Sequence, residues 1–229
     1  MRGSVALGRG DHILAWRALS PDRRHTTEVL PAIRDMLAET GSEPRDVSVV
    51  GFSQGPGSFT GLRVAATIAR MWQSATGCEV VAVPTLEVIA QNVLSCPDPP
   101  GRIAAILDAR RGRLFGAVYE RVGADALRNT AEAALHDAEP WLQSLEQPCS
   151  VVGEGLAEHQ DSVIKAGLDP LPESIWLPDA RQVLAIGRRV ATAGRFCGPQ
   201  EIVPAYLRPP ECEEVYEQRR AEARARRGE

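Results

Sequence analysis

Hydrophobic and polar positions along this 229-residue chain alternate in blocks that predict short strands and amphipathic helices. The first two apolar blocks, 3–7 and 12–19, are joined by the turn residues 8–11, which predicts a β-hairpin. Between 26 and 39 the apolar residues recur at helical spacing on one face. The chain is therefore expected to enter a sheet at once and to continue into an amphipathic helix.

The segment 47–72 is the most informative stretch of the sequence. It predicts a buried strand, a glycine-rich turn and a helix from about Thr60 to Ala75. Such a junction collects free backbone N–H groups and the positive end of the helix dipole, an arrangement that suits phosphate. Tight packing of the strand against the helix is an equally good explanation of the glycines. The weak candidates for cofactor binding are Gly55, Gly57, Ser58, Thr60 and Gly61.

Three named motifs fit this turn poorly. A Walker loop needs a lysine directly after its last glycine, and Gly61 is followed by Leu62. The glycine spacing also misses the dinucleotide-binding fingerprint. Ser53 lies in a formal G-x-S-x-G match, but in a hydrolase the helix starts directly after that serine, whereas Gly55-Pro-Gly57 intervenes here. A serine hydrolase is therefore disfavoured.

The pattern restarts after a proline-rich linker at 95–101, and this divides the chain into two halves. Each half predicts a mixed sheet flanked by helices, so the fold class is α/β with two related domains, 1–97 and 98–229. Only 120–147 is hard to interpret, apart from a short helix near 141–145. The other expected elements are strands at 78–83, 103–107, 114–119 and 149–152 and helices at 85–94, 156–166 and 180–193.

Composition narrows the chemistry. The net charge of −4 gives no whole-chain case for nucleic-acid binding, and Lys165 is the only lysine. The five cysteines form no C-x-x-C pair and the four histidines are far apart, so no dedicated metal site is expected. With no apolar stretch of 18 residues, a soluble, cytoplasmic protein without membrane contact is predicted. The arginine-rich segment 219–227 is interpreted as a solvated helical tail.

Candidate acids and bases are scarce. Asp108 follows a strand and precedes three arginines, a pattern that fits either an anion site or, more commonly, a turn with exposed charge. Without a convincing set of acids, bases or ligands, the sequence favours a binding or scaffold protein over a self-sufficient enzyme.

Five segments in the right order carry a resemblance to one family. They are His25-Thr-Thr-Glu-Val-Leu-Pro-Ala-Ile33, Gly55-Pro-Gly-Ser-Phe-Thr-Gly-Leu-Arg63, Val83-Pro-Thr-Leu-Glu87, Leu107-Asp-Ala-Arg-Arg-Gly112 and Pro204-Ala-Tyr-Leu-Arg208. In these motifs the chain resembles the bacterial TsaB (YeaZ) family over nearly its whole length.

The resemblance implies an actin-like ATPase (ASKHA) fold and a part in making N6-threonylcarbamoyladenosine at position 37 of ANN-decoding tRNAs. It further implies a non-catalytic subunit that pairs with its catalytic paralogue TsaD, with the ATPase TsaE joining the complex. The chain would reach tRNA through that complex, have no cofactor of its own, and meet ATP or ADP at the interface with TsaD. A homodimer of the free protein stays an alternative.

In the family, the two helices of the first domain pack against TsaD. Here they correspond to 26–39 and 60–75, and both carry more apolar surface than one sheet face needs. Part of this surface is predicted to form the partner interface, with Trp72 as its aromatic anchor. For each of these residues, a position in the hydrophobic core is the alternative. The predicted interface residues are Val29, Ile33, Met36, Leu37, Val64, Ile68, Met71 and Trp72.

One departure from the family concerns the N-terminus. Family members usually begin with an apolar strand and an Asp-Thr-Ser type turn ahead of the strand at 4–7, and this sequence begins after them. Either the start is placed too late or the first strand is missing, and its loss would weaken nucleotide binding. The alternative function is an enzyme acting alone, either a small-molecule kinase of the actin-like group or a peptidase-like hydrolase.

Overall fold

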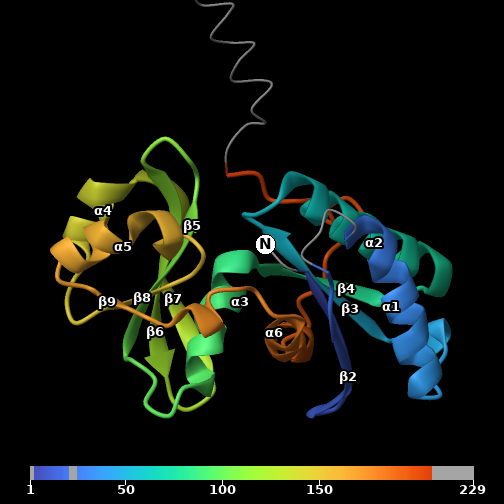
Figure 1. The fold of residues 1–229 in the computed structure, drawn as a ribbon. Helices are drawn as coiled ribbons and strands as arrows, with labels where there is room; N and C mark the ends of the chain where they lie inside the picture. The colour runs from blue at the N-terminus through green and yellow to red at the C-terminus, as the bar shows by residue number, and fades with distance from the viewer. Residues whose placement is uncertain (1–2, 21–24, 208–229) are drawn as a thin grey trace, which may run out of the picture.

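The computed structural model describes residues 3–20 and 25–207 and shows an α/β protein (Figure 1). The strands are β1 (Ser4–Arg9), β2 (His12–Ala18), β3 (Val49–Gly55), β4 (Glu79–Pro84), β5 (Arg102–Asp108), β6 (Arg113–Val122), β7 (Ala126–Asp137), β8 (Ser150–Val152) and β9 (Asp169–Pro170). The α-helices are α1 (His25–Glu39), α2 (Phe59–Thr76), α3 (Thr85–Gln91), α4 (Ala138–Ser144), α5 (Leu156–Lys165) and α6 (Ala180–Thr192). Short 3-10 helices are η1 (Pro44–Asp46), η2 (Asn92–Ser95) and η3 (Glu173–Ile175).

The N-terminal strands form one layer between helices. Helices α1 and α2 lie on one side of the strands and α6 on the other (Figure 1). Alternation along β4 explains both contacts, because Val80 packs toward α2 with Phe52 and Ala69, whereas the next residue, Val81, packs toward Ile186 of α6. The chain therefore returns from its C-terminal part to cover the N-terminal strands.

This layer holds two separate sheets where a single mixed sheet was expected. β1 pairs antiparallel with β2, and β3 pairs parallel with β4. Among the described residues, no strand pairs with the second edge of β1 or of β3. Helix α6 contacts both sheets. The absence of a first strand ahead of Ser4 stays a prediction.

The C-terminal strands form one continuous mixed sheet in the order β7-β6-β5-β8-β9. One face packs against α4 and α5 through Leu142, Leu156 and Val163, and the other face packs against α3 through Leu86 and Ile89. Residues Ile103 to Leu107 of the central strand β5 are all buried. This sheet therefore carries the largest part of the hydrophobic core.

Strand β7 was missed by the sequence analysis, which found no pattern in 120–147. Among the described strands it lies at the edge of the sheet and pairs with β6 alone, with register shifts that interrupt the alternation of side chains. The short helix near 141–145 was correctly expected and corresponds to α4. Trp141 of this helix lies directly over Gly116 of β6, where an added Cβ would come within 2.5 Å of the indole ring.

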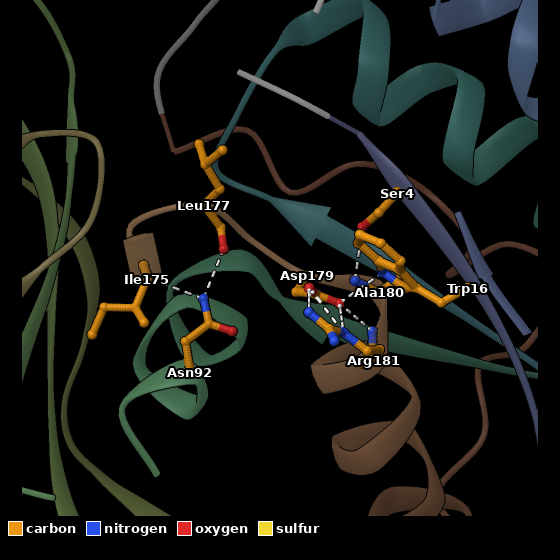
Figure 2. A network of polar contacts seen from close by, with 8 residues as sticks. All are labelled: Ser4, Trp16, Asn92, Ile175, Leu177, Asp179, Ala180 and Arg181. Atoms are coloured by element: carbon orange, nitrogen blue, oxygen red, sulfur yellow. Dashed lines mark hydrogen bonds and ion pairs between the residues drawn. The ribbon is translucent and has the colours of Figure 1, made fainter. Parts of the chain in front are cut away.

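A polar network ties the two parts of the chain together (Figure 2). The Asn92 side chain donates hydrogen bonds to the carbonyl oxygens of Ile175 (3.0 Å) and Leu177 (2.7 Å), which fixes the segment leading into α6. Asp179 then caps α6 by accepting from the Arg181 backbone N–H (2.8 Å), and it also accepts from Trp16 Nε1 (3.1 Å). The hairpin β1-β2 is thereby attached to the start of α6.

Asp179 is charged in this network. Its burial alone would raise the pKa of the carboxyl, but hydrogen bonds from Arg181 and the positive charge of that residue outweigh burial and lower the pKa. The guanidinium of Arg181 also stacks over the Trp16 ring at 4.6 Å.

The domain boundary near residue 97 stays a prediction, and the arginine-rich tail lies outside the described residues. Within those residues, no helix is long and apolar enough to cross a membrane.

Candidate partner interface

Helices α1 and α2 border an apolar groove on the outer side of the N-terminal layer. Its volume is about 180 Å³, smaller than the roughly 300–1,000 Å³ of typical small-molecule pockets. Met71 is 61% exposed and Leu30 is 50% exposed, although both are large apolar side chains. The lining residues are Leu30, Pro44, Ile68, Met71, Trp72, Ala75 and Thr76. A groove of this size and polarity suits one or two apolar side chains of another protein.

Trp72 is fixed in the wall of this groove. Its indole Nε1 donates a hydrogen bond to the carbonyl oxygen of Pro44 (3.1 Å), and the ring is half-buried. Because this hydrogen bond already fixes the ring, a partner protein could cover its exposed apolar surface with little further loss of side-chain entropy. Its geometry suits the anchoring role predicted from the sequence, which stays a prediction.

The eight predicted interface residues divide into three groups in the structure. Val29, Ile33, Val64, Ile68 and Trp72 are half-buried, and Met71 is exposed. Met36 and Leu37 are only 3% and 7% exposed, so they belong to the core and not to a surface. They take the core position that the sequence left open as the alternative for each residue, because the apolar stripe of α1 is wide and these two positions face inward.

Two groove residues escaped the sequence analysis. Leu30 was recognised as part of the apolar stripe but was not assigned to the interface. Pro44 belongs to η1, a loop segment without an apolar pattern, and only the packing of η1 beside α2 brings it to the groove. No signal in the sequence marks that position.

The glycine-rich turn packs, at Gly55, against the backbone of a distant segment of the same chain. Gly55 is buried with φ +131°, and a Cβ there would come within 2.6 Å of the Ala205 carbonyl oxygen. The Ala205 N–H in turn donates to the carbonyl oxygen of Gln54 (2.9 Å). Gly57, Thr60 and Gly61 are exposed. The buried glycine therefore serves a close contact between two backbones, while nucleotide binding at this turn stays a prediction.

Ser58 provides the cap of α2. Its hydroxyl accepts a hydrogen bond from the Gly61 N–H at 3.4 Å. The helix ends at Gly77, which takes the left-handed conformation with φ +74°. Strand, turn and capped helix were all predicted from the sequence, and the structure confirms that α2 starts beside Thr60.

An aromatic and cationic cluster at the start of α2 was not predicted. The Phe59 and Tyr206 rings stack with centroids 5.2 Å apart, and the guanidinium carbon of Arg63 lies 3.9 Å from the centre of the Phe59 ring. Arg63 Nε also donates to the Tyr206 hydroxyl at 3.0 Å. Two segments of the family resemblance, 55–63 and 204–208, meet in this cluster. Nothing in the spacing of either segment indicated their contact.

The serine considered for hydrolase chemistry is hydrogen-bonded to another hydroxyl group. Ser53 lies inside β3, and its hydroxyl shares a hydrogen bond with the Thr85 hydroxyl (2.7 Å). The strand continues to Gly55 and the helix begins only at Phe59, so the sharp turn of a nucleophile elbow is missing at Ser53.

Burial also raises the pKa of the Cys149 thiol to about 11, which disfavours a reactive thiolate at neutral pH.

Asp108 is part of a turn, as the more common interpretation of its sequence context predicted. One carboxylate oxygen, Oδ1, accepts from the Arg110 N–H at 3.0 Å and lies 3.4 Å from Nε2 of the buried His159. Arg110 and Arg111 take positive φ values of 63° and 57°. Within the described part of the chain, no group of three or more His, Cys, Asp and Glu side chains is placed to hold a metal ion.

Comparisons with known proteins agree on one family. The family model described as TsaD: tRNA N6-adenosine threonylcarbamoyltransferase matches residues 13–203. The tRNA threonylcarbamoyladenosine biosynthesis protein TsaB of Escherichia coli (strain K12) is 29% identical over 208 residues, covering 90% of this chain and 89% of that protein. The protein of the same name from Bacillus subtilis (strain 168) is 31% identical over 161 residues, covering 69% of each chain.

The fold agrees as well. The structure of YeaZ from Pseudomonas aeruginosa matches with a TM-score of 0.76 and 24% identity, covering 90% of this chain and 94% of that chain. This likeness establishes the common fold, and the sequence matches establish the relationship. The chain therefore belongs to the TsaB (YeaZ) family and has its actin-like fold.

Proposed function

We propose that this chain is an accessory subunit of the complex that installs the threonylcarbamoyl group on N6 of adenosine 37 in ANN-decoding tRNAs. It acts by binding a TsaD protein through the face formed by α1 and α2, while TsaD carries out the transfer. TsaE and tRNA join through the complex, and a nucleotide at the interface with TsaD is part of the proposal. The observation that carries this proposal is the apolar groove between α1 and α2 in a member of the TsaB family.

The groove supports binding because it leaves large apolar side chains in water. Met71 is 61% exposed, and covering the exposed part of its side chain removes apolar surface from water, which favours association. Ile68 and Trp72 supply adjoining half-buried surface. A partner side chain that enters the groove would therefore contact a preformed apolar wall.

The chemistry of the described residues supports an accessory role over an enzyme acting alone. A kinase needs carboxylates that hold Mg²⁺ near the transferred phosphate. The glycine-rich turn packs against Ala205, and Asp46 precedes the strand that leads into this turn and is exposed in η1. A peptidase needs an activated nucleophile, and Ser53 is hydrogen-bonded to Thr85 instead of to a base.

Reconstitution of the tRNA modification tests the proposal. Purified TsaD, TsaE, tRNA and the threonylcarbamoyl donor are combined with and without this chain, and the modified adenosine is counted by mass spectrometry. The modification should require the chain, and the chain alone should turn over no ATP. Modification at the full rate without the chain would refute the accessory role, and ATP turnover by the chain alone would favour a kinase.

A further inference from the structure

One row of side chains on α2 connects the aromatic cluster to the groove. The row runs at intervals of four residues, and every member is exposed: Phe59, Arg63, Thr67, Met71 and Ala75. Rows of this spacing form the ridges with which helices pack into the grooves of other helices. Because Thr67 and Ala75 are small, they permit a close approach of a second helix. The last two members of the row, Met71 and Ala75, also line the apolar groove.

Arg63 is held in place at the other end of this ridge. Its guanidinium stacks on Phe59, and its Nε is engaged by the Tyr206 hydroxyl. Its two terminal nitrogens have no hydrogen-bond or ion-pair partner among the described residues. An arginine fixed by stacking loses less side-chain entropy on binding, and its free fork matches the geometry of a carboxylate.

The helix offers this arginine no carboxylate of its own. The sequence of α2 contains Arg63 and Arg70 but neither aspartate nor glutamate. Pairing this ridge with α2 of a second copy would place arginines near one another, and the facing helix would bring Arg63 no carboxylate. Charge complementarity therefore favours a different protein as the occupant, one that brings acidic side chains.

We propose that, within the interface proposed above, the TsaD partner pairs a carboxylate with the terminal nitrogens of Arg63 and places an apolar side chain in the groove. This inference rests on the proposed function and specifies the chemistry of the partner surface. Arg63 and Met71 are eight positions apart, which is about 12 Å along the helix. The two partner groups are therefore separated by about two helical turns. An interface of standard size, about 800 Å² per partner, easily covers both points.

Calorimetric titration of the full chain with the TsaD protein of the same organism tests this inference. Arg63→Ala should weaken binding at least about tenfold, because the partner's carboxylate loses its counter-ion at the interface. Arg63→Lys should recover only part of the loss, since lysine lacks the fork and the stacking. Arg70→Ala is the matched control: an exposed arginine of the same helix outside the ridge, expected to change affinity less than about twofold.

Salt dependence and a second variant distinguish the loss of a specific contact from a loss of binding through misfolding. The affinity of the unchanged chain should fall more steeply with added NaCl than that of Arg63→Ala. Tyr206→Phe removes the hydroxyl that holds Arg63 without changing any charge, and it should weaken binding about threefold through lost pre-organisation. Circular dichroism melting curves check that each variant is folded.

The outcomes separate this inference from the proposed function. If Met71→Asp abolishes binding while Arg63→Ala and Tyr206→Phe leave it unchanged, the acidic partner is refuted and the accessory role stands. If none of the three changes affects binding, both are refuted. A loss confined to self-association in sedimentation, or to tRNA crosslinking, would assign Arg63 to another partner and overturn the inference.

Discussion

Strands β1 and β5 are similar in sequence but differ in their surroundings. Both are short and rich in alanine and aliphatic side chains, yet every residue from Ile103 to Leu107 of β5 is buried, whereas no residue of β1 is. β5 has a strand on each edge and helices on each face, while β1 has one neighbouring strand in the part of the chain that the structure describes. Hydrophobic pattern thus predicts that a strand forms, and the number of neighbours decides how far it is buried. The C-terminal sheet is covered by helices on both faces, and the N-terminal layer carries the surface that we propose for the partner.

The largest predicted effect is a core substitution in the closed sheet. Ile106→Ala should lower the free energy of unfolding by about 2–5 kcal/mol, because it creates a cavity at a completely buried site. Val5→Ala in β1 should cost less than about 1 kcal/mol, since the half-buried side chain already contacts water. Urea denaturation measures both values. Equal losses would contradict the proposed difference between the two regions.

The contact between the two regions should be nearly as sensitive. Asn92→Ala removes two hydrogen bonds and leaves the carbonyl oxygens of Ile175 and Leu177 without this donor, at a cost of about 2–3 kcal/mol. Asn92 itself is buried, so water does not easily replace its amide. A single cooperative transition with a lower midpoint in urea is expected. Two separated transitions would show that the regions unfold independently once this contact is lost.

Sequence reasoning recovered the elements well because their signals are local. The hairpin β1-β2, the helices α1 and α2 and the strand β5 follow from apolar spacing and turn residues that neighbours in sequence supply. The open edges of β1 and β3 could not be predicted from periodicity, since the pattern of a strand is the same with one neighbour or two. Only the resemblance to the family pointed to a strand in that place.

The candidate interface stays a prediction, and the structure divides its residues between the groove and the core. Helical spacing identified Met71 and Trp72 on α2 but also selected Met36 and Leu37, because an apolar stripe does not show which of its residues the sheet covers. In the cluster of Phe59, Arg63 and Tyr206, the hydrogen bond from Arg63 to Tyr206 joins residues that lie 143 positions apart in the sequence. Such a contact depends on the path of the whole chain and leaves no local signal.

A smaller effect is predicted where the hairpin meets α6. Asp179→Asn keeps a capping oxygen but loses the charge that pairs with Arg181, so about 0.5–1 kcal/mol should be lost at pH 7, a value that allows for solvent screening. The carboxyl pKa is lowered by folding, and its stabilisation is therefore present above the unfolded pKa of about 3.9 and lost as the pH falls through the folded value. Melting curves at pH 7 and in acid measure the difference, which should disappear in acid. A difference that persists in acid would show that charge is not the cause.

The smallest predicted effect has the opposite sign. Burial raises the pKa of Glu87, and the nearby charges of Arg189 and Arg195 compensate only in part. A carboxyl with a raised pKa costs stability once the pH exceeds its ordinary value of 4.5. Glu87→Gln should therefore raise the free energy of unfolding by a few tenths to about 1 kcal/mol at pH 7 and change nothing below pH 4. A loss at pH 7 would mean that the ion pair with Arg189 outweighs burial.

Hydrogen exchange of the chain with and without TsaD tests most directly whether the N-terminal layer is the surface that binds the partner. Mass spectrometry of peptides from the two regions compares the protection that binding adds. Binding through the α1–α2 face predicts slower exchange in α1 and α2 and unchanged exchange in α4 and α5. Protection confined to α4 and α5, with α1 and α2 exchanging as in the free chain, would contradict it.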